Sequence, residues 1–326
     1  MKFESWRPGL LPAVVRFWNR AFSGKRNFFP MTEELFLSRI VRKRTSVEGF
    51  DPEGFVVARE GGEVAGFVHV GVRTEALVRS LDAEWPGGTQ GYLAFLYVDA
   101  ARRKKGIGGE LWHRGLERLQ GTRQVVVDGQ CWNPFYGNSE GPFTPFWGTP
   151  EGVSVEWDSY ATKKFFARKG FAPRFKGVQL AAALAGVTTP GFEAAERMLA
   201  RGGFQLRLLQ GEYPELGRPS KARRYVPPGL DFDVASAVKN GRTVGLVAAF
   251  PMKEVRAGLH AIYEANVLGP YRGRALGRNL LAAALARMKA RGAESCEVLT
   301  IPEISPVAHK LYLAAGFLPQ ASWAVY

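Results

Sequence analysis

Hydrophobic and polar positions follow helical and strand periods in an order that occurs twice along the chain. In the first half, apolar residues at helical spacing predict helices over 11–22 and 32–41. Strand-like runs predict two strands within 55–70, joined by a turn at Gly61-Gly62, and a third strand over 92–98. A helix to about residue 119, a strand over 124–127 and a helix over 160–168 that ends at Gly170-Phe171 follow.

The second half repeats this order from about residue 203. Strands are expected over 232–238 and 243–250, joined by Asn240-Gly241, a pair typical of a tight hairpin turn, and over 260–267. A helix marked by Leu276, Leu280 and Leu281, a strand over 297–301, a helix over 307–315 that ends at Gly316-Phe317 and a last strand complete the repeat. We therefore expect a mixed α/β protein of two tandem domains, 1–180 and 203–326, with 181–202 as the linker.

A short basic loop between a strand and a helix also occurs in both halves. The first copy is Val98-Asp-Ala-Ala-Arg-Arg103-Lys-Lys-Gly106-Ile-Gly108-Gly-Glu-Leu111, and the second is Val267-Leu-Gly-Pro-Tyr-Arg272-Gly-Arg-Ala275-Leu-Gly277-Arg-Asn-Leu280. Small residues at the start of a helix expose consecutive backbone N–H groups, which suit a pyrophosphate. Each loop therefore indicates a phosphate site, although either could simply cap its helix.

Composition narrows the class of protein. The 326 residues are 46% hydrophobic and 23% charged, which is typical of a globular protein. The sequence has no apolar run long enough to predict a membrane span, and its start lacks the apolar core of a secretory signal. The two cysteines, Cys131 and Cys296, fall in different halves, and the four histidines are scattered. We therefore expect a cytoplasmic protein with neither a disulfide framework nor a metal site.

The net charge of +14 indicates an acidic ligand, such as a phosphorylated cofactor or nucleic acid, or simply an arginine-rich surface. Several of the positive residues fall inside the two loops, which favours a phosphorylated cofactor. No long basic tail or aromatic-studded basic strand points to nucleic acid as the principal partner.

Residues 129–157 break the pattern, because they are rich in Gly, Pro and aromatic residues. So long an irregular segment can be a lid or a wall of an acceptor pocket, or a structural flap over the first domain. The sequence leaves both interpretations open.

With these features the chain resembles the GNAT superfamily of N-acetyltransferases, in a tandem two-domain form similar to that of the mycothiol synthases. The loop, the phase of its helix, the next strand and the later Gly-Phe end match in both halves. The resemblance implies that each domain is a mixed β-sheet flanked by helices. The sheet is expected to splay at the strand before the loop, where it admits the pantetheine arm of acetyl-CoA.

The resemblance also implies which residues hold the acetyl-CoA. In the first half they are Val98, Arg103, Lys104, Lys105, Gly106, Ile107, Gly108 and Gly109. In the second half they are Val267, Arg272, Gly273, Arg274, Ala275, Leu276, Gly277 and Arg278. Because Ala275 stands where the first loop has Gly106, the second loop is expected to be the poorer match.

Catalysis in this family is direct attack of an amine on the thioester, often with a tyrosine acid four residues before the glycine of the Gly-Phe end. That position is Tyr312 in the second half and Phe166 in the first. Phenylalanine has no proton to give, so the resemblance implies that the C-terminal half catalyses. The first half would bind cofactor unproductively or serve as a scaffold. Tyr312 could otherwise be a half-buried structural tyrosine.

The base is harder to assign. Glu264 is the only carboxylate in 260–267, but family carboxylates often lie one residue earlier, where this chain has Tyr263. His260 is the other titratable group in this segment, and both it and Glu264 could be structural.

The resulting expectation is an acetyl-CoA-dependent N-acetyltransferase that acts on a primary amine of a small molecule or peptide. The alternatives are a non-catalytic acyl-CoA-binding or regulatory tandem protein and, with less support, a nucleic-acid-associated protein.

Overall fold

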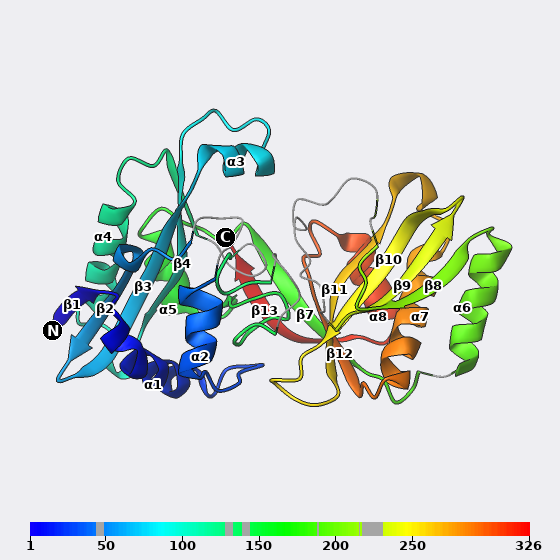
Figure 1. The fold of residues 1–326 in the computed structure, drawn as a ribbon, viewed down its shortest axis with the longest axis horizontal. Coiled ribbons are helices and arrows are strands. Elements are labelled where there is room, and N and C mark those ends of the chain that lie inside the picture. Colours follow the sequence, from blue (N-terminus) through cyan, green and yellow to red (C-terminus); the bar gives the residue numbers. More distant parts are fainter. Residues whose placement is uncertain (44–48, 128–132, 139–143, 188, 215, 217–230) are drawn as a thin grey trace. The chain divides into compact units, whose positions relative to one another are not determined.

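The computed structural model describes the chain except for residues 44–48, 128–132, 139–143, 188, 215 and 217–230 (Figure 1). Two compact units are formed, one within Met1–Glu140 and Phe146–Gly148, the other within Gly141–Pro145 and Thr149–Tyr326. Each unit is built on its own mixed β-sheet. The expected class, a mixed α/β protein with two sheets, is confirmed.

The sheet of the first unit has five strands in sequence order. They are β1 (Lys2–Ser5), β2 (Phe55–Glu60), β3 (Glu63–Arg73), β4 (Gln90–Val98) and β5 (Gln124–Val127). The pairings are antiparallel except for β4 with β5, which are parallel and pair from Gln90 to Leu93.

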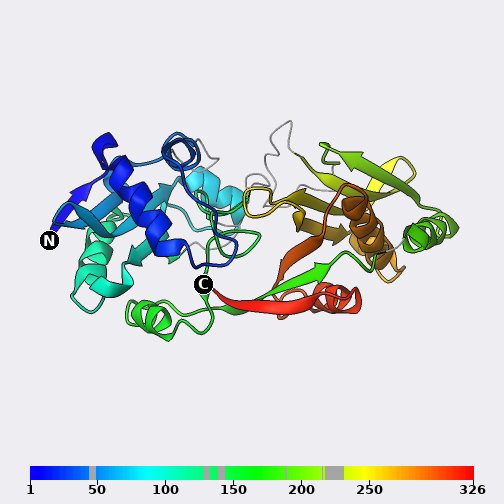
Figure 2. The same ribbon diagram turned by 90° about the horizontal axis from the view of Figure 1, so that it is seen from below.

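Helices cover both faces of this sheet (Figure 2). The helices of the unit are α1 (Leu11–Phe22), α2 (Glu33–Phe36, continued by a wider turn Leu37–Val41), α3 (Glu75–Leu81) and α4 (Ile107–Arg118). Because side chains alternate along β3, Phe67 packs against Phe17 of α1, whereas Val68 and Val70 lie against Gly115 of α4. α3 was not expected from the sequence.

The sheet of the second unit has eight strands in the order β6-β13-β7-β12-β11-β10-β9-β8. Their bounds are β6 (Val155–Glu156), β7 (Phe175–Ala183), β8 (Gln205–Gln210), β9 (Asp233–Lys239), β10 (Arg242–Pro251), β11 (Leu259–Val267), β12 (Ser295–Thr300) and β13 (Leu318–Val325). Only β11 and β12 pair in parallel, from Leu259 to Ala261. The helices are α5 (Tyr160–Ala167), α6 (Thr189–Arg201), α7 (Leu276–Ala290) and α8 (Pro306–Ala314).

Strand β7 comes from the first repeat of the sequence but lies in the second sheet. It pairs with β12 from Val178 to Ala183 on one side and with β13 from Phe175 to Ala181 on the other (Figure 1). Residues 181–202, expected to link the halves, contain the end of β7 and helix α6. Residues 1–180 and 203–326 remain the proposed extents of the two sequence repeats. The boundaries of the two compact units differ from them, because β7 of the first repeat packs in the second unit.

Several aromatic residues of the segment 129–157 lie in the core of the first unit, whereas residues 149–157 belong to the second unit. The rings of Tyr136 and Phe146 are buried against Trp18, and that of Trp147 stacks on Phe22. These contacts favour the structural alternative for these residues. Trp132 and Phe143 lie outside the described residues.

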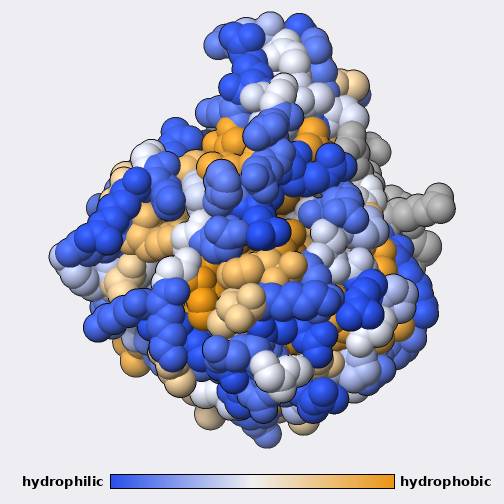
Figure 3. Space-filling view, turned by 90° about the vertical axis from the view of Figure 1, so that its left-hand side faces the viewer, coloured by the Kyte–Doolittle hydropathy of each residue, from blue (hydrophilic) through white to orange (hydrophobic). Residues whose placement is uncertain are grey.

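The surface is mainly hydrophilic on the side shown in Figure 3, where hydrophobic side chains form small patches. Among the described residues, no helix is long and apolar enough to cross a membrane. In the same part of the chain, no three His, Cys, Asp or Glu side chains lie close enough together to hold a metal ion. Cys296 is a buried free thiol, and Cys131 lies outside the described residues.

Candidate active site

The two basic loops have the same backbone course. Each begins with a short 3-10 turn, Ala100–Arg102 or Gly269–Tyr271, and leads into a helix whose N-cap residue is left-handed. The side chains of Arg103 and Arg272 each donate through Nε to the carbonyl of the strand's last residue, Val98 at 3.0 Å and Val267 at 2.9 Å. The loop repeat seen in the sequence is therefore also a repeat of conformation.

Left-handed residues occur at the same two positions of each loop. In the first loop they are Lys104 (φ 63°) and Gly106 (φ 81°), and in the second Gly273 (φ 75°) and Ala275 (φ 58°). Of the two left-handed residues in each loop, one is a glycine and the other is a non-glycine residue for which this conformation is strained. Ala275 adopts the conformation of Gly106, and the expectation that the second loop is the poorer pyrophosphate site stays a prediction.

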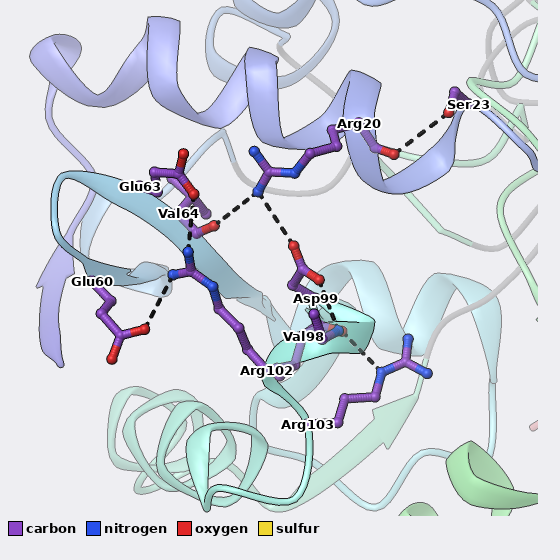
Figure 4. A network of polar contacts seen from close by, with 10 residues as sticks. Arg20, Ser23, Glu60, Glu63, Val64, Val98, Asp99, Arg102 and Arg103 are labelled. Carbon is purple, nitrogen blue, oxygen red and sulfur yellow. Dashed lines mark hydrogen bonds and ion pairs between the residues drawn. The ribbon is translucent and has the colours of Figure 1, made fainter.

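Some charged groups of the first loop are engaged in ion pairs, and others are exposed. The Arg102 guanidinium forms ion pairs with Glu63 (2.9 Å) and Glu60 (3.6 Å), and the neighbouring Asp99 pairs with Arg20 at 3.3 Å (Figure 4). Lys104 and Lys105 are exposed beside the helix start. Arg102 therefore anchors the loop, and the two lysines remain for an anion.

Both loops fit a pyrophosphate. The first N–H groups of a helix have no partner within it, and neither N-cap forms a side-chain cap hydrogen bond. A Cβ built on Gly106, Gly109 or Gly273 would meet no atom within 4 Å, so the space over the backbone is open. Ile107 and Leu276, the first helical residues, are buried and fix the two helix ends against their cores.

A β-bulge marks the strand before each loop. On β4, Leu93 pairs with Val70 and Phe95 with His69, so Ala94 is an extra residue. On β11, Ile262 pairs with Ala249 and Glu264 with Ala248, so Tyr263 is the extra residue. In the second unit, the parallel pairing of β11 with β12 ends at Ala261, before the bulge. By register, Glu264 in the second unit corresponds to Phe95 in the first.

Glu264 lies directly after the bulge of β11, half-buried, with a hydrogen-bond donor on each carboxylate oxygen. The Tyr213 hydroxyl donates to Oε2, and Asn266 Nδ2 donates to Oε1 at 3.1 Å. Burial raises the pKa of Glu264 to about 7, although the Asn266 bond opposes this shift. A carboxylate that titrates near neutral pH can accept a proton from an amine.

Tyr312 is buried on α8, and its ring packs against Phe317 of the Gly-Phe end. Burial raises the pKa of the Tyr312 phenol, and the charges of the Glu151 and Glu264 carboxylates add to the shift. Tyr312 and Glu264 therefore lie close enough for the charge of Glu264 to raise the pKa of Tyr312. The phenol keeps its proton at neutral pH, as an acid must.

His260 has a different environment. It is buried at the start of β11, its Nδ1 has no hydrogen-bond partner, and burial lowers its pKa. Three charged groups act on its pKa: Asp233, Arg291 and Asp231. Arg291 forms ion pairs with both aspartates. These contacts favour a structural role for His260.

In the first unit, the residues at the bulge of β4, which correspond to Tyr263 and Glu264, are contacted by other side chains of the same unit. Asn133 Nδ2 donates to the carbonyl of the extra residue Ala94 at 2.6 Å, and the ring of Tyr136 packs on Phe95. Phe166 lies in the second unit, buried against Tyr326. The positions of Glu264 and Tyr312 thus correspond to two phenylalanines in the first repeat.

Sequence reasoning missed Tyr213, Asn266 and Glu151 as neighbours of this site. The spacing of Asn266 and Glu264 on one strand could have suggested their contact. Tyr213 and Glu151 carry no such local signal, because the first is 51 residues from Glu264 and the second comes from the irregular segment.

Comparisons with known proteins agree with this fold. The acetyltransferase (GNAT) family matches residues 12–133 and 205–317. A tandem GNAT protein from the clavulanic acid biosynthesis pathway has a similar structure (TM-score 0.63, 16% identity, 99% of this chain and 96% of that one). A GCN5-related N-acetyltransferase from Sphaerobacter thermophilus is also similar (TM-score 0.54, 18% identity, 99% and 93%).

A third similar structure is a fungal multi-domain β-N-acetylglucosaminidase with a glucosamine N-acetyltransferase region (TM-score 0.65, 16% identity). It covers 99% of this chain, which spans only 37% of the fungal protein. No curated protein sequence matches the chain. Since the family match covers both repeats and most of the sequence, the chain belongs to the GNAT acetyltransferase family, in its tandem two-domain form.

Proposed function

We propose that this GNAT acetyltransferase transfers the acetyl group of acetyl-CoA to a primary amine of a small molecule or peptide, and that the chemistry takes place in the C-terminal half. The observation that carries the proposal is the asymmetry of two matched positions. Glu264 and Tyr312 lie near each other in the second unit, and the matching positions of the first repeat are Phe95 and Phe166.

The family uses acetyl-CoA, which supplies an acetyl thioester. In the second half, the amides at the start of α7 and the exposed Arg272, Arg274 and Arg278 would hold its pyrophosphate. The matching residues of the first loop, from Arg103 to Gly109, would hold a second cofactor molecule, with no acyl transfer there. The first bulge supports this division, because Asn133 already occupies the Ala94 carbonyl.

Two side chains would move protons in the reaction. Glu264 accepts a proton from the acceptor ammonium, which leaves the amine lone pair free to attack the thioester carbonyl. Tyr312 donates the phenolic proton to the departing thiolate and then recovers a proton from solvent or from the acceptor. Glu264 must be ionised for the first step, so turnover should rise with pH through about 7.

The test follows release of the free CoA thiol over a panel of primary amines, with a matched pair of loop variants. We expect Gly277→Asp to lower kcat/KM by roughly a hundredfold or more, because a carboxylate beside the pyrophosphate is repelled. Gly108→Asp should leave turnover near that of the wild type. The opposite result would assign the chemistry to the first half. Tight CoA binding with no turnover on any amine would support the non-catalytic alternative.

A further inference from the structure

Glu264 is held from two sides by groups that the family resemblance does not assign. Asn266 lies on the same strand, but Tyr213 comes from the connection between β8 and β9. With both carboxylate oxygens engaged, the side chain has a defined orientation.

Packing fixes the position of the Tyr213 hydroxyl. The Tyr213 ring lies 5.5 Å from that of Phe232 and 6.4 Å from that of Tyr263, perpendicular to the latter. Phe232 is fully buried, and its carbonyl accepts a hydrogen bond from the Gly211 amide at 3.0 Å. The backbone on which Tyr213 lies is therefore tied to the start of β9.

The bulge gives this contact its geometry. In a regular strand, Tyr263 and Glu264 would point to opposite faces, but the extra residue in β11 changes the alternation. Tyr213 then contacts both of them, the first through its ring and the second through its hydroxyl. In the first unit the residue after the bulge is Phe95, which has no carboxylate to hold.

We propose that Tyr213 is a positioning residue for acetyl transfer, which holds the Glu264 carboxylate in the orientation and charge state needed to take a proton from the acceptor amine. The proposal rests on the proposed role of Glu264 as the base. A donor to a carboxylate favours its ionised form, so Tyr213 and Asn266 together counteract the effect of burial.

Other titratable groups lie near Glu264. Tyr263 is its neighbour along β11, Tyr312 on α8 is coupled to it electrostatically, and Glu151 carries a charge near Tyr312. Tyr213 differs from these in its direct hydrogen bond to the carboxylate.

The first experiment needs no acceptor. The Glu264 titration is read as the protonated-carboxyl band in infrared spectra of wild type minus Glu264→Gln, measured over pH 5–9, and is compared between wild type and Tyr213→Phe. We expect Tyr213→Phe to raise the midpoint by roughly 0.5–1 pH unit, because one donor to the ionised form is lost. Tyr160→Phe removes a hydroxyl from an exposed ring of the same unit and should leave the midpoint unchanged. An unchanged or lowered midpoint in Tyr213→Phe would overturn the proposal.

The second experiment uses an amine that supports turnover. The acid limb of kcat/KM should move upward in Tyr213→Phe by the same amount, while Tyr213→Phe in a Glu264→Gln background should have no further effect. A tyrosine that only packs would leave the limb in place, because phenylalanine keeps the ring. If Glu264→Gln itself leaves both the limb and the rate unchanged, the base assignment fails, and the proposal for Tyr213 fails with it. If Glu264→Gln abolishes the limb but Tyr213→Phe does not move it, only the proposal for Tyr213 fails.

Discussion

At the scale of single residues, the two repeats differ where chemistry would take place. Tyr312 and Phe166 occupy the same position before a Gly-Phe end, and Glu264 and Phe95 the same position after a bulge. Both replacements keep a buried ring or introduce one, so packing is retained while the proposed proton-transfer groups are absent. The first repeat therefore lacks both the proposed acid and the proposed base.

Tyr312→Phe tests the acid directly. We expect turnover to fall by roughly a hundred- to ten-thousand-fold, because a positioned proton donor is lost. Thermal unfolding should change little, since Phe166 shows that phenylalanine packs at the equivalent position. Unchanged turnover would mean that Tyr312 is structural.

At the scale of elements, loop conformation is conserved between the repeats although the glycines are not. Lys104 and Ala275 are left-handed although they are not glycines. In each loop the other left-handed position is a glycine, Gly106 or Gly273. The anchors Arg103 and Arg272 make the same bond to the strand end. The loop shape thus depends on these contacts more than on any one glycine.

Gly106→Ala and its counterpart Ala275→Gly test this view of the loops. Gly106→Ala should lower the free energy of unfolding by ~1 kcal/mol, the cost of a left-handed alanine, since its Cβ meets no atom within 4 Å. Ala275→Gly should change the free energy by less than ~1 kcal/mol, because the relief of strain is offset by the greater entropy of the unfolded chain. Urea unfolding measures both, and a loss well above 2 kcal/mol for Gly106→Ala would contradict the expectation.

At the scale of the whole molecule, the second sheet is completed by a strand from the first repeat. β7 lies between β12 and β13, and its Gln179 donates to the buried Glu297 at 2.6 Å while accepting from Trp323 at 3.0 Å. Without β7, two strands would lose their ladder partner and a buried carboxylate would lose a donor. The second repeat alone therefore lacks part of its own fold.

Fragments of the chain test this dependence. We expect residues 203–326 to be unfolded or aggregated, and residues 149–326, which include β7, to unfold cooperatively. Circular dichroism and urea unfolding distinguish the two. A cooperatively folded 203–326 fragment would show that β7 is dispensable.

Local signals explain what could be predicted. The bounds of α1 and β5 and the Asn240-Gly241 turn agree with the sequence expectation, because period and turn chemistry act over a few residues. Helix α6 was missed, although Ala195 and Leu199 form a buried stripe, because its start at Thr189-Pro190 resembles a linker. The roles of Glu264 and Tyr312 remain predictions.

The sequence by itself determined the family, the mixed α/β class and the repeated loop, since each of these is encoded within a short window. Only the tertiary structure decided the place of β7, the facing of Glu264 and its contact with Tyr213. These depend on strand register and on residues 50 or more positions apart, whose pairing is selected by the packed sheet rather than by any local pattern.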